Sequence, residues 1–204
     1  MTGSQPTVVV VDHGSGNLRS AERALARVGA DVTVTSDLQS AYDADGVVLP
    51  GVGAFAACMA GVRDVRADNL VRERLKLRRP VLGICVGMQV LYDAGEEHGL
   101  RTEGIAVLPG DVTRLDAPIL PHMGWNTVEA DEDSRLFAGV GGERFYFVHS
   151  YAVRPGGSTG ETVTVHGVPF VAAVETGVLS ATQFHPEKSG DAGLTLLENW
   201  LKTL

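Results

Sequence analysis

The sequence contains only two cysteines in 204 residues, Cys58 and Cys85. A disulfide-stabilised scaffold needs more cysteines than this, so we exclude that class of small secreted protein. Neither cysteine belongs to a Cys-x-x-Cys pair or lies near histidines at the spacing of metal ligands. We therefore expect reduced thiols, no bound metal and no cofactor.

The sequence also has no apolar run close to the roughly 20 residues that cross a bilayer. The early run TVVVVD lacks the charged flank and the cleavage site of a signal peptide. The 17 Lys and Arg residues are scattered and the formal net charge is −8, unlike the basic surface of a nucleic-acid-binding protein. These absences predict a cytoplasmic protein that binds neither membranes nor nucleic acids.

Short apolar segments alternate with amphipathic ones through the first half of the chain, which is typical of βαβ units around a buried parallel sheet. The expected strands there are 7–12, 31–36, 46–50 and 80–85, and the expected helices are 17–28 and 64–78. Closely spaced strand candidates in the second half indicate added hairpins, at 105–108, 144–151, 162–165, 170–176 and 178–184. We expect a single α/β domain over residues 1–204. A C-terminal helix closes it, with one apolar face formed by Leu194, Leu197, Leu201 and Leu204.

A glycine-flanked cysteine lies where a predicted strand meets a helical segment, in the string Gly83-Ile84-Cys85-Val86-Gly87. Glycines on both sides of a nucleophile allow a tight turn and leave room for a substrate. The turn would place the Cys85 sulfur at the amino end of the next helix, which favours the thiolate, and would present the Val86 N–H to an oxyanion. The alternative is a small buried side chain, because free cysteines are often buried. We assign that packing role to Cys58.

His185 is the candidate acid–base residue among the six histidines, because it follows a predicted strand and Glu187 lies two residues later. Residues i and i+2 of an extended segment point to the same side, so Glu187 can orient the imidazole ring. Imidazole is suited to proton transfer near neutral pH. A loop histidine beside a solvated glutamate is the alternative, and the coincidence with the cysteine turn shifts the balance. His122 and His149 lack such a carboxylate, and we expect structural or interface roles for them.

A glycine pair follows the predicted strand 46–50, in the loop Gly51-Val52-Gly53. The carboxyl edge of an open α/β sheet is where ligands bind. The two glycines would let the peptide turn the Val52 N–H toward a developing oxyanion, where it would pair with the N–H of Val86. An ordinary strand-to-helix turn is the alternative for this motif on its own.

The strings GICVGMQ and QFHPEKS, in this order, resemble those of the class I, triad-type glutamine amidotransferases. The strings VDHGSGNL, LPGVGAF, PHMGWN and FYFVHSY narrow the resemblance to the glutaminase subunits of imidazole glycerol phosphate synthase, an enzyme of histidine biosynthesis. The resemblance covers almost the whole chain. It implies a flavodoxin-like α/β fold with a mainly parallel sheet and added antiparallel hairpins. It also implies a triad of Cys85, His185 and Glu187, with the Val52 and Val86 amides as the oxyanion hole.

The same resemblance implies glutamine as the substrate, bound by Gly53, Gln89, Glu97, Ser150 and Tyr151. It implies that ammonia released at the cysteine passes to a separate (β/α)₈-barrel cyclase subunit in a heterodimer. There ammonia reacts with a phosphoribulosyl-formimino ribonucleotide to give imidazole glycerol phosphate and an aminoimidazole carboxamide ribonucleotide. The residues implied at the interface are His122, Trp125, Asn126, Tyr146 and Lys188. A core position is the alternative for Trp125, because tryptophan is usually buried.

His13 departs from the family pattern, in which a tyrosine is expected at that position, and we draw no functional conclusion from it. The rival interpretations are a glutaminase that serves another synthase, a cysteine peptidase on the same scaffold, and a catalytically silent interaction module. The PGVG and HMGWN strings argue against the first. An open substrate groove would indicate the second, and failure of Cys85 to react with a glutamine-analogue alkylator would indicate the third.

Overall fold

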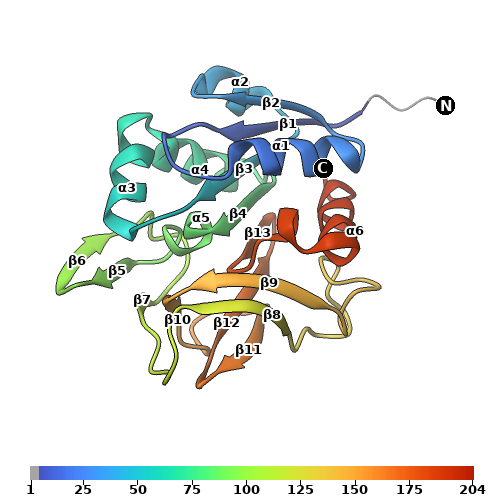
Figure 1. Ribbon diagram of the computed structural model, residues 1–204. Helices are drawn as coiled ribbons and strands as arrows, with labels where there is room; N and C mark the ends of the chain where they lie inside the picture. The colour runs from blue at the N-terminus through green and yellow to red at the C-terminus, as the bar shows by residue number, and fades with distance from the viewer. Residues whose placement is uncertain (1–4) are drawn as a thin grey trace.

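A computed structural model describes residues 5–204 (Figure 1). The strands of its central sheet are β1 (Thr7–Val11), β2 (Asp31–Thr35), β3 (Gly46–Gly51), β4 (Val81–Cys85), β11 (Glu161–His166), β12 (Val168–Thr176) and β13 (Leu179–Thr182). Their spatial order is β11-β12-β13-β4-β3-β1-β2. The strands from β13 to β2 are parallel, and β12 and β11 are antiparallel additions at one edge. Counted along the chain, the parallel strands have the flavodoxin-like order 2-1-3-4-5, which confirms the predicted fold class.

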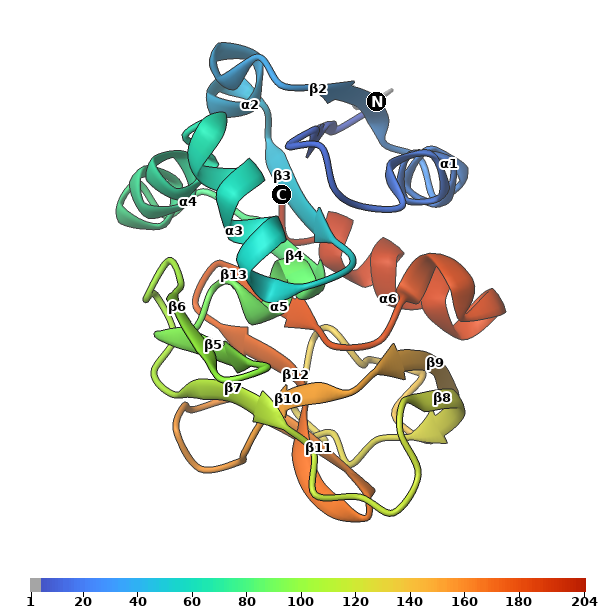
Figure 2. The same ribbon diagram turned by 60° about the vertical axis from the view of Figure 1, so that its left-hand side comes forward.

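Helices cover both faces of the parallel part of the sheet (Figure 2). One face is covered by α1 (Leu18–Arg27) and α6 (Gly190–Leu201), and the other by α2 (Leu38–Asp43), α3 (Phe55–Asp64) and α4 (Ala67–Lys76). The buried residues of α1, Ala21, Ala24 and Leu25, have the spacing of one helical face. The predicted C-terminal helix is confirmed as α6, but it ends at Leu201, before Leu204. Its buried face contains Leu196 and Trp200, and Leu197 is the one residue of the predicted face that it buries fully. Within residues 5–204, no helix has the length and apolar character needed to cross a membrane.

The single helix predicted over 64–78 is wrong in its bounds. It corresponds to α4, which begins only at Ala67 because the chain turns after α3 at Arg66, whose φ is 60°. The helix α3 contains Cys58 and buries it together with Phe55 and Met59. Small residues with one buried stripe are therefore enough to form a helix here.

Two smaller sheets pack against the antiparallel end of the central sheet (Figures 1 and 2). One has the order β10-β7-β5-β6, and the other pairs β8 with β9. Their strands are β5 (Ala94–Glu97), β6 (Leu100–Glu103), β7 (Asp111–Arg114), β8 (His122–Thr127), β9 (Arg144–His149) and β10 (Tyr151–Val153). The predicted strand 144–151 is thus two strands in different sheets, divided at Ser150.

The strand predicted over 105–108 is wrong. Ala106 has a φ of 56°, which no strand residue adopts. The backbone N–H groups of residues 105–108 donate to the carbonyl oxygens of Val90, Leu91 and Tyr92. Ile105 and Leu108 are buried because the run folds over the chain that follows the nucleophile, and burial without a strand partner gives the same sequence pattern.

The carboxyl ends of β3 and β4 lie side by side, and their register places Gly51 opposite Cys85. The one-turn helix α5 (Val86–Gln89) continues from β4. The 3₁₀ turn η1 (Pro186–Lys188) follows β13, the other neighbour of β4. The loops that carry the three predicted motifs therefore meet at one edge of the sheet.

Candidate active site

Cys85 ends β4 with a φ of 57° and a ψ of −115°. A non-glycine residue rarely adopts a positive φ, and such strain is concentrated at functional sites. A Cβ at Gly83 would lie 2.9 Å from the Leu91 side chain, and a Cβ at Gly87 would lie 1.9 Å from the carbonyl oxygen of Leu49. Both glycines are therefore required by the packing of the turn. The helix α5 has only four residues, so fewer aligned peptide dipoles act on the sulfur than the sequence suggested.

His185 and Glu187 are in contact, as predicted. Nδ1 of His185 lies 2.8 Å from Oε1 of Glu187, and the two side chains are 3% and 2% exposed. Burial disfavours the charged ring, but hydrogen bonds with Cys85 and Glu187 outweigh it and raise the pKa of His185 to about 9. The ring is therefore protonated at neutral pH. The backbone between the two residues is the 3₁₀ turn η1 rather than the extended segment we assumed.

A pocket with a cavity volume of about 230 Å³ opens beside Cys85. Sites for drug-sized ligands are typically larger, roughly 300–1,000 Å³, so this pocket suits a ligand the size of an amino acid. The lining residues include every predicted catalytic, oxyanion-hole and substrate residue except Glu187, which lies behind His185. They are Val52, Gly53, Cys85, Val86, Gln89, Glu97, Val148, His149, Ser150, Tyr151, His185 and Lys188.

The side chain of Glu97 faces this pocket, and its Oε2 accepts the Phe55 N–H at 3.1 Å. The neighbouring Glu96 lines a different hollow, together with His98 and Arg114. The alternation of side chains along β5 sends the two carboxylates to opposite sides.

The loop after β1 holds the predicted oxyanion loop at both ends. The buried ring of His13 donates from Nε2 to the carbonyl oxygen of Pro50 at 2.6 Å. The Ser15 hydroxyl donates to the Val52 carbonyl oxygen at 2.7 Å and accepts the Val52 N–H at 3.3 Å. The Val52 N–H is thus occupied, and the expected pair of oxyanion donors is not assembled in this conformation. The contact with Pro50 also gives His13, the departure from the family pattern, a structural role.

Two buried histidines connect the pocket to the hairpin formed by β8 and β9. Nδ1 of His149 lies 3.0 Å from the Tyr151 carbonyl oxygen, which can only accept, so this nitrogen carries the proton. Nε2 of His149 must then accept from Nδ1 of His122 at 3.0 Å. Nε2 of His122 in turn faces the side-chain nitrogen of Asn126 at 3.5 Å. The hydrogen bonds therefore run in one direction, from the hairpin to the pocket wall.

We expect the two histidines to make the fold less stable in acid. Burial lowers the pKa of His122 to about 4 and that of His149 to about 3, from an ordinary value of 6.5. Between the lowered pKa values of the folded state and the ordinary value of 6.5, the unfolded chain binds more protons at these two histidines than the folded chain does. The free energy of unfolding therefore falls as the pH drops from about 6.5 to about 4. His185, with its raised pKa, is protonated in both states well below pH 6.5 and adds little to the pH dependence there.

Urea unfolding at neutral pH and at about pH 4.5 measures this slope. We expect a smaller loss of stability in the double variant His122→Gln/His149→Gln than in the wild type. The variant His98→Gln, at an exposed position, is the matched control. Its loss of stability between the two pH values should equal that of the wild type. An equal loss of stability in the wild type and the double variant would contradict the assignment of the acid sensitivity to His122 and His149.

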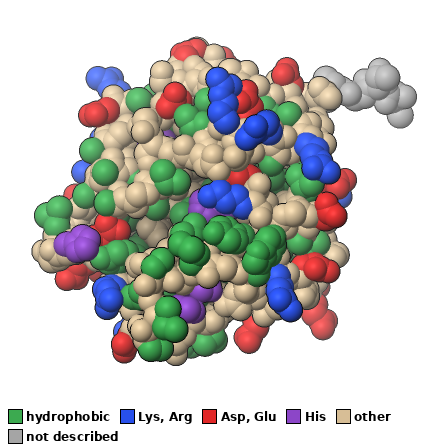
Figure 3. All heavy atoms as spheres, in the orientation of Figure 1, with side chains coloured by type: hydrophobic (Ala, Val, Ile, Leu, Met, Phe, Trp, Pro, Cys, Tyr) green, Lys and Arg blue, Asp and Glu red, His purple; other side chains and the backbone are tan. Residues whose placement is uncertain are grey.

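The outer face of the β8–β9 hairpin carries exposed hydrophobic side chains. Met123 and Trp125 are 62% and 53% exposed, so a core position for Trp125 is wrong. The Trp125 ring packs edge to face on Tyr146, at 6.0 Å between centroids. Hydrophobic side chains gather across the middle of the face drawn in Figure 3, over the region of β8 and β9. The partner of Met123 in the hairpin is Val148, which lines the pocket, so this face reaches the pocket mouth.

The other residues predicted at the interface are placed differently. Lys188 is exposed and lines the pocket, and Asn126 is half-buried within β8 of the hairpin. The His122 side chain faces inward and is 5% exposed, with its ring stacked on His166 at 4.2 Å. It lies one layer beneath the surface, because alternate residues of β8 point inward, and its predicted place at the interface stays a prediction.

Three side chains of the site were not identified from the sequence. Ser15 holds the Val52 peptide, Val148 lines the pocket, and Gln183 lies within 4.0 Å of the Cys85 sulfur. Gln183 could have been found, because it precedes His185 by two residues and shares its side of an extended segment. Ser15 carries no such signal, since its contact joins segments 37 residues apart.

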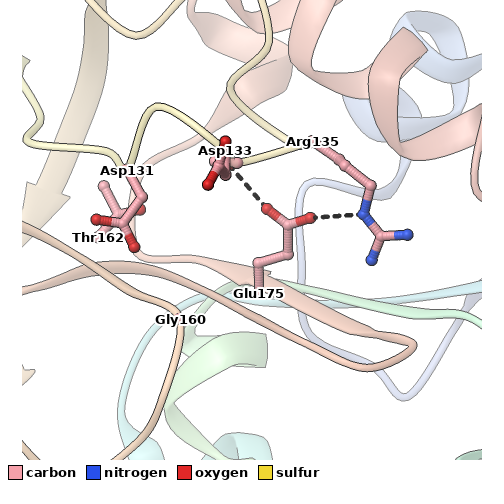
Figure 4. Close-up of a pocket in the computed structure, with 7 residues that line it drawn as sticks. Asp131, Asp133, Arg135, Gly160, Thr162 and Glu175 are labelled. Atoms are coloured by element: carbon pink, nitrogen blue, oxygen red, sulfur yellow. Dashed lines mark hydrogen bonds and ion pairs between the residues drawn. The ribbon is translucent and has the colours of Figure 1, made fainter.

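A second hollow, lined by segment 131–135, the start of β11 and Glu175 of β12, has an acidic character (Figure 4). Its Glu175 accepts hydrogen bonds from Ser134 Oγ at 2.8 Å, Leu136 N at 3.2 Å and Arg135 Nε at 3.3 Å. The carboxylate is thus engaged in holding segment 134–136 against β12. Across residues 5–204, no three His, Cys, Asp or Glu side chains are grouped so that they could hold a metal ion.

Comparison with known proteins places the chain in a family. The profile of "Glutamine amidotransferase class-I" matches residues 9–204. Proteins named imidazole glycerol phosphate synthase subunit HisH are similar over nearly their whole length. The one from Thermobifida fusca is 59% identical over 98% of this chain and 100% of the relative. The one from Nocardia farcinica is 60% identical over the same shares.

Solved structures agree at the level of the fold. A structure described as a glutamine amidotransferase has a TM-score of 0.73 at 20% identity, over 96% of this chain and 99% of that chain. The structure of PurLQS from Thermotoga maritima has a TM-score of 0.72 at 20% identity, over 97% and 98% of the two chains. With the family profile and the full-length relatives, these likenesses show that the chain belongs to the class-I glutamine amidotransferases, in the HisH family of imidazole glycerol phosphate synthase subunits.

Proposed function

We propose that the protein is the glutaminase subunit of a cytoplasmic imidazole glycerol phosphate synthase. It hydrolyses L-glutamine to L-glutamate and ammonia, and passes the ammonia to a (β/α)₈-barrel cyclase subunit for imidazole glycerol phosphate formation. The observation that carries the proposal is the contact of His185 with Glu187 at 2.8 Å, in a pair whose imidazole lines an amino-acid-sized pocket together with Cys85. The names of the similar proteins supply the synthase. The family profile and a continuous buried core support a single domain over residues 1–204.

The proposed reaction is acyl transfer through Cys85. The thiolate attacks the side-chain carbonyl carbon of glutamine, and the Val86 N–H, joined by the Val52 N–H once it turns, binds the oxyanion. His185 gives its proton to the departing nitrogen, so the C–N bond breaks and ammonia leaves a γ-glutamyl thioester. Water then attacks the thioester with His185 as the base, and glutamate is released. Glu187 holds the imidazole ring in one orientation.

The amino-acid end of glutamine is proposed to lie between β5 and β10. Glu97 and Gln89 offer acceptor oxygens for its ammonium group, and the backbone at Gly53, Ser150 and Tyr151 lines the remaining wall. The small volume of the pocket, about 230 Å³, argues against a peptidase, which would need a long groove for a polypeptide.

The cyclase subunit is proposed to dock on the outer face of the β8–β9 hairpin. Trp125 and Tyr146 form the centre of this face, and Lys188 marks the pocket mouth. A partner seated there would cover the mouth, so ammonia would leave toward the partner rather than into solvent. An exposed tryptophan beside a tyrosine is also the side-chain combination that dominates binding energy at protein interfaces.

The test of the function is glutamate formation from glutamine by the purified chain, alone and with an imidazole glycerol phosphate synthase cyclase subunit and its nucleotide. We expect low activity alone and strong activation in the complex. Fast turnover without the cyclase would point to another amidohydrolase. No turnover in either setting, together with no reaction of Cys85 with a glutamine-analogue alkylator, would indicate a silent module.

Replacing Ser15 by alanine is expected to raise the glutaminase activity of the isolated chain. The Ser15 hydroxyl occupies the Val52 N–H, so its removal frees a donor that the oxyanion needs. One oxyanion donor typically contributes about 100-fold or more to the rate. We expect Ser15→Ala to gain part of this contribution, a rise of about tenfold in the glutaminase rate. The exposed Ser36→Ala is the control. Unchanged or lower activity in Ser15→Ala would show that this contact does not restrain the loop.

Replacing Trp125 by alanine is expected to weaken the binding of the cyclase subunit. A central interface tryptophan contributes at least about 2 kcal/mol, which is about 30-fold in Kd. Titration calorimetry with the cyclase subunit measures the change. Leu77→Ala is the control, because Leu77 is similarly exposed, at 52%, but lies at the end of α4. Equal affinities of Trp125→Ala and the wild type would place the interface elsewhere.

A further inference from the structure

The side chain of Gln183 is buried at the centre of the site and has no role in the mechanism above. Gln183 directly follows β13, and its backbone N–H donates to the Ala172 carbonyl oxygen at 2.8 Å. This bond fixes the backbone in the sheet, and the side chain is 1% exposed. A buried carboxamide needs partners for its donors and its acceptor.

The partners of this carboxamide are the nucleophile and a proposed substrate residue. Its oxygen accepts a hydrogen bond from Nε2 of Gln89 at 2.9 Å. Its nitrogen lies 4.0 Å from the sulfur of Cys85, at the long end of an N–H···S hydrogen bond. Gln183 therefore bridges the reacting atom and the wall of the pocket.

The bond to Gln183 also settles the orientation of the Gln89 amide. The nitrogen of Gln89 donates to Gln183 and, at 2.9 Å, to the Tyr151 carbonyl oxygen. A peptide carbonyl can only accept, so the Gln89 NH₂ group must lie on that side. Both of its protons are then used, and the Gln89 oxygen remains as an acceptor at the pocket wall. An ammonium group is the donor that fits it.

We propose that Gln183 is a further catalytic residue with two effects. Its N–H supports the Cys85 thiolate, and its carbonyl oxygen holds the Gln89 amide so that the Gln89 oxygen accepts from the α-ammonium group of glutamine. The second effect rests on the proposed function, whereas the first concerns only the reactivity of the sulfur.

Two variants separate the effects. Gln183→Glu keeps an oxygen acceptor for Gln89 but removes the donor and places a carboxylate beside the thiolate. Gln183→Met keeps the length of the side chain and removes both groups. Thr182→Val is the matched control, because Thr182 is also fully buried on β13 and its hydroxyl contacts only the Phe184 carbonyl oxygen.

The measurements are kcat and KM for glutamine in the complex with the cyclase subunit and its nucleotide, and the rate of Cys85 alkylation by iodoacetamide across pH. Iodoacetamide has no amino-acid end, so it reports on the sulfur alone. Loss of one hydrogen bond to a charged group changes a rate or an affinity by about tenfold. We expect alkylation at neutral pH to slow by about that factor in both variants, and the pH midpoint of alkylation to rise in Gln183→Glu. KM should rise about tenfold in Gln183→Met and stay near the wild-type value in Gln183→Glu.

If Gln183 had a merely structural role, both variants would lower the melting temperature. The KM for glutamine would then not differ between Gln183→Met and Gln183→Glu. Alkylation rates and KM values within twofold of the wild type and of Thr182→Val would overturn the proposal. If Gln183→Met does not fold, the alkylation of Gln183→Glu decides. If the wild-type complex does not hydrolyse glutamine, the proposed function fails, and the alkylation comparison still tests the contact between Gln183 and Cys85.

Discussion

Replacing Cys85 by alanine is expected to lower glutamine hydrolysis in the cyclase complex by at least about 10⁴-fold, as removal of the nucleophile does in other triad enzymes. The sulfur has no substitute in the pocket. Cys58, the other thiol, is fully buried in α3, and burial, with a smaller effect from Cys85, raises its pKa to about 12. It is therefore a neutral thiol at working pH and cannot take over the attack.

The change removes one atom from a 4% exposed position, so the fold and the docking face should survive. Added ammonium salt should restore product formation by the cyclase, because the cyclase needs only ammonia. Cys58→Ala is the matched control and should keep most of the activity. Glutamate formation by Cys85→Ala above about one-hundredth of the wild-type rate would mean that Cys85 is not the nucleophile.

Replacing Gly87 by alanine is expected to reduce the free energy of unfolding by at least about 3 kcal/mol, the upper range for overpacking. The added Cβ would lie 1.9 Å from the Leu49 carbonyl oxygen and 2.8 Å from its carbonyl carbon. These are backbone atoms of β3, which is hydrogen-bonded to β1 on one side and to β4 on the other. A flexible side chain could move away, but this strand cannot.

The same clash should remove activity even in the molecules that remain folded, because it would push β3 away from the turn that carries Cys85 and Val86. Urea unfolding measures the stability, and Gly142→Ala is the control. A Cβ at Gly142 meets no atom within 4 Å, so its effect should stay within about 0.5 kcal/mol. If Gly87→Ala were as stable as Gly142→Ala, the backbone near Gly87 would be able to move and make room for the added Cβ.

The residues that carry the chemistry could be predicted because each lies in a short string with a local signal. Cys85 lies between two glycines at the end of an apolar run, and His185 precedes a carboxylate by two residues. The alternation of apolar and amphipathic segments was equally local, so the parallel sheet followed from it.

The remaining features depend on contacts between distant segments. The run Ile105–Leu108 is apolar because it covers the chain after the nucleophile, which no periodicity reveals. The strand β8 carries its large hydrophobic residues, Met123 and Trp125, on the exposed side, so the usual pattern of a strand is reversed there. The occupied N–H of Val52 depends on Ser15, and only the three-dimensional structure brings the two loops together.

Hydrogen bonds from Asn126 through His122 and His149 to Tyr151 link the hairpin to the wall of the pocket. A chain of imidazole rings can serve as a proton wire only when a ring takes up a proton and the last group can pass it on. Here both rings stay neutral at physiological pH, and the chain ends on a peptide carbonyl, which has no proton to exchange. Only a movement of the side chains can therefore be passed along these hydrogen bonds. A partner that presses on the hairpin would therefore shift the Tyr151 carbonyl mechanically, without changing the protonation of the pocket.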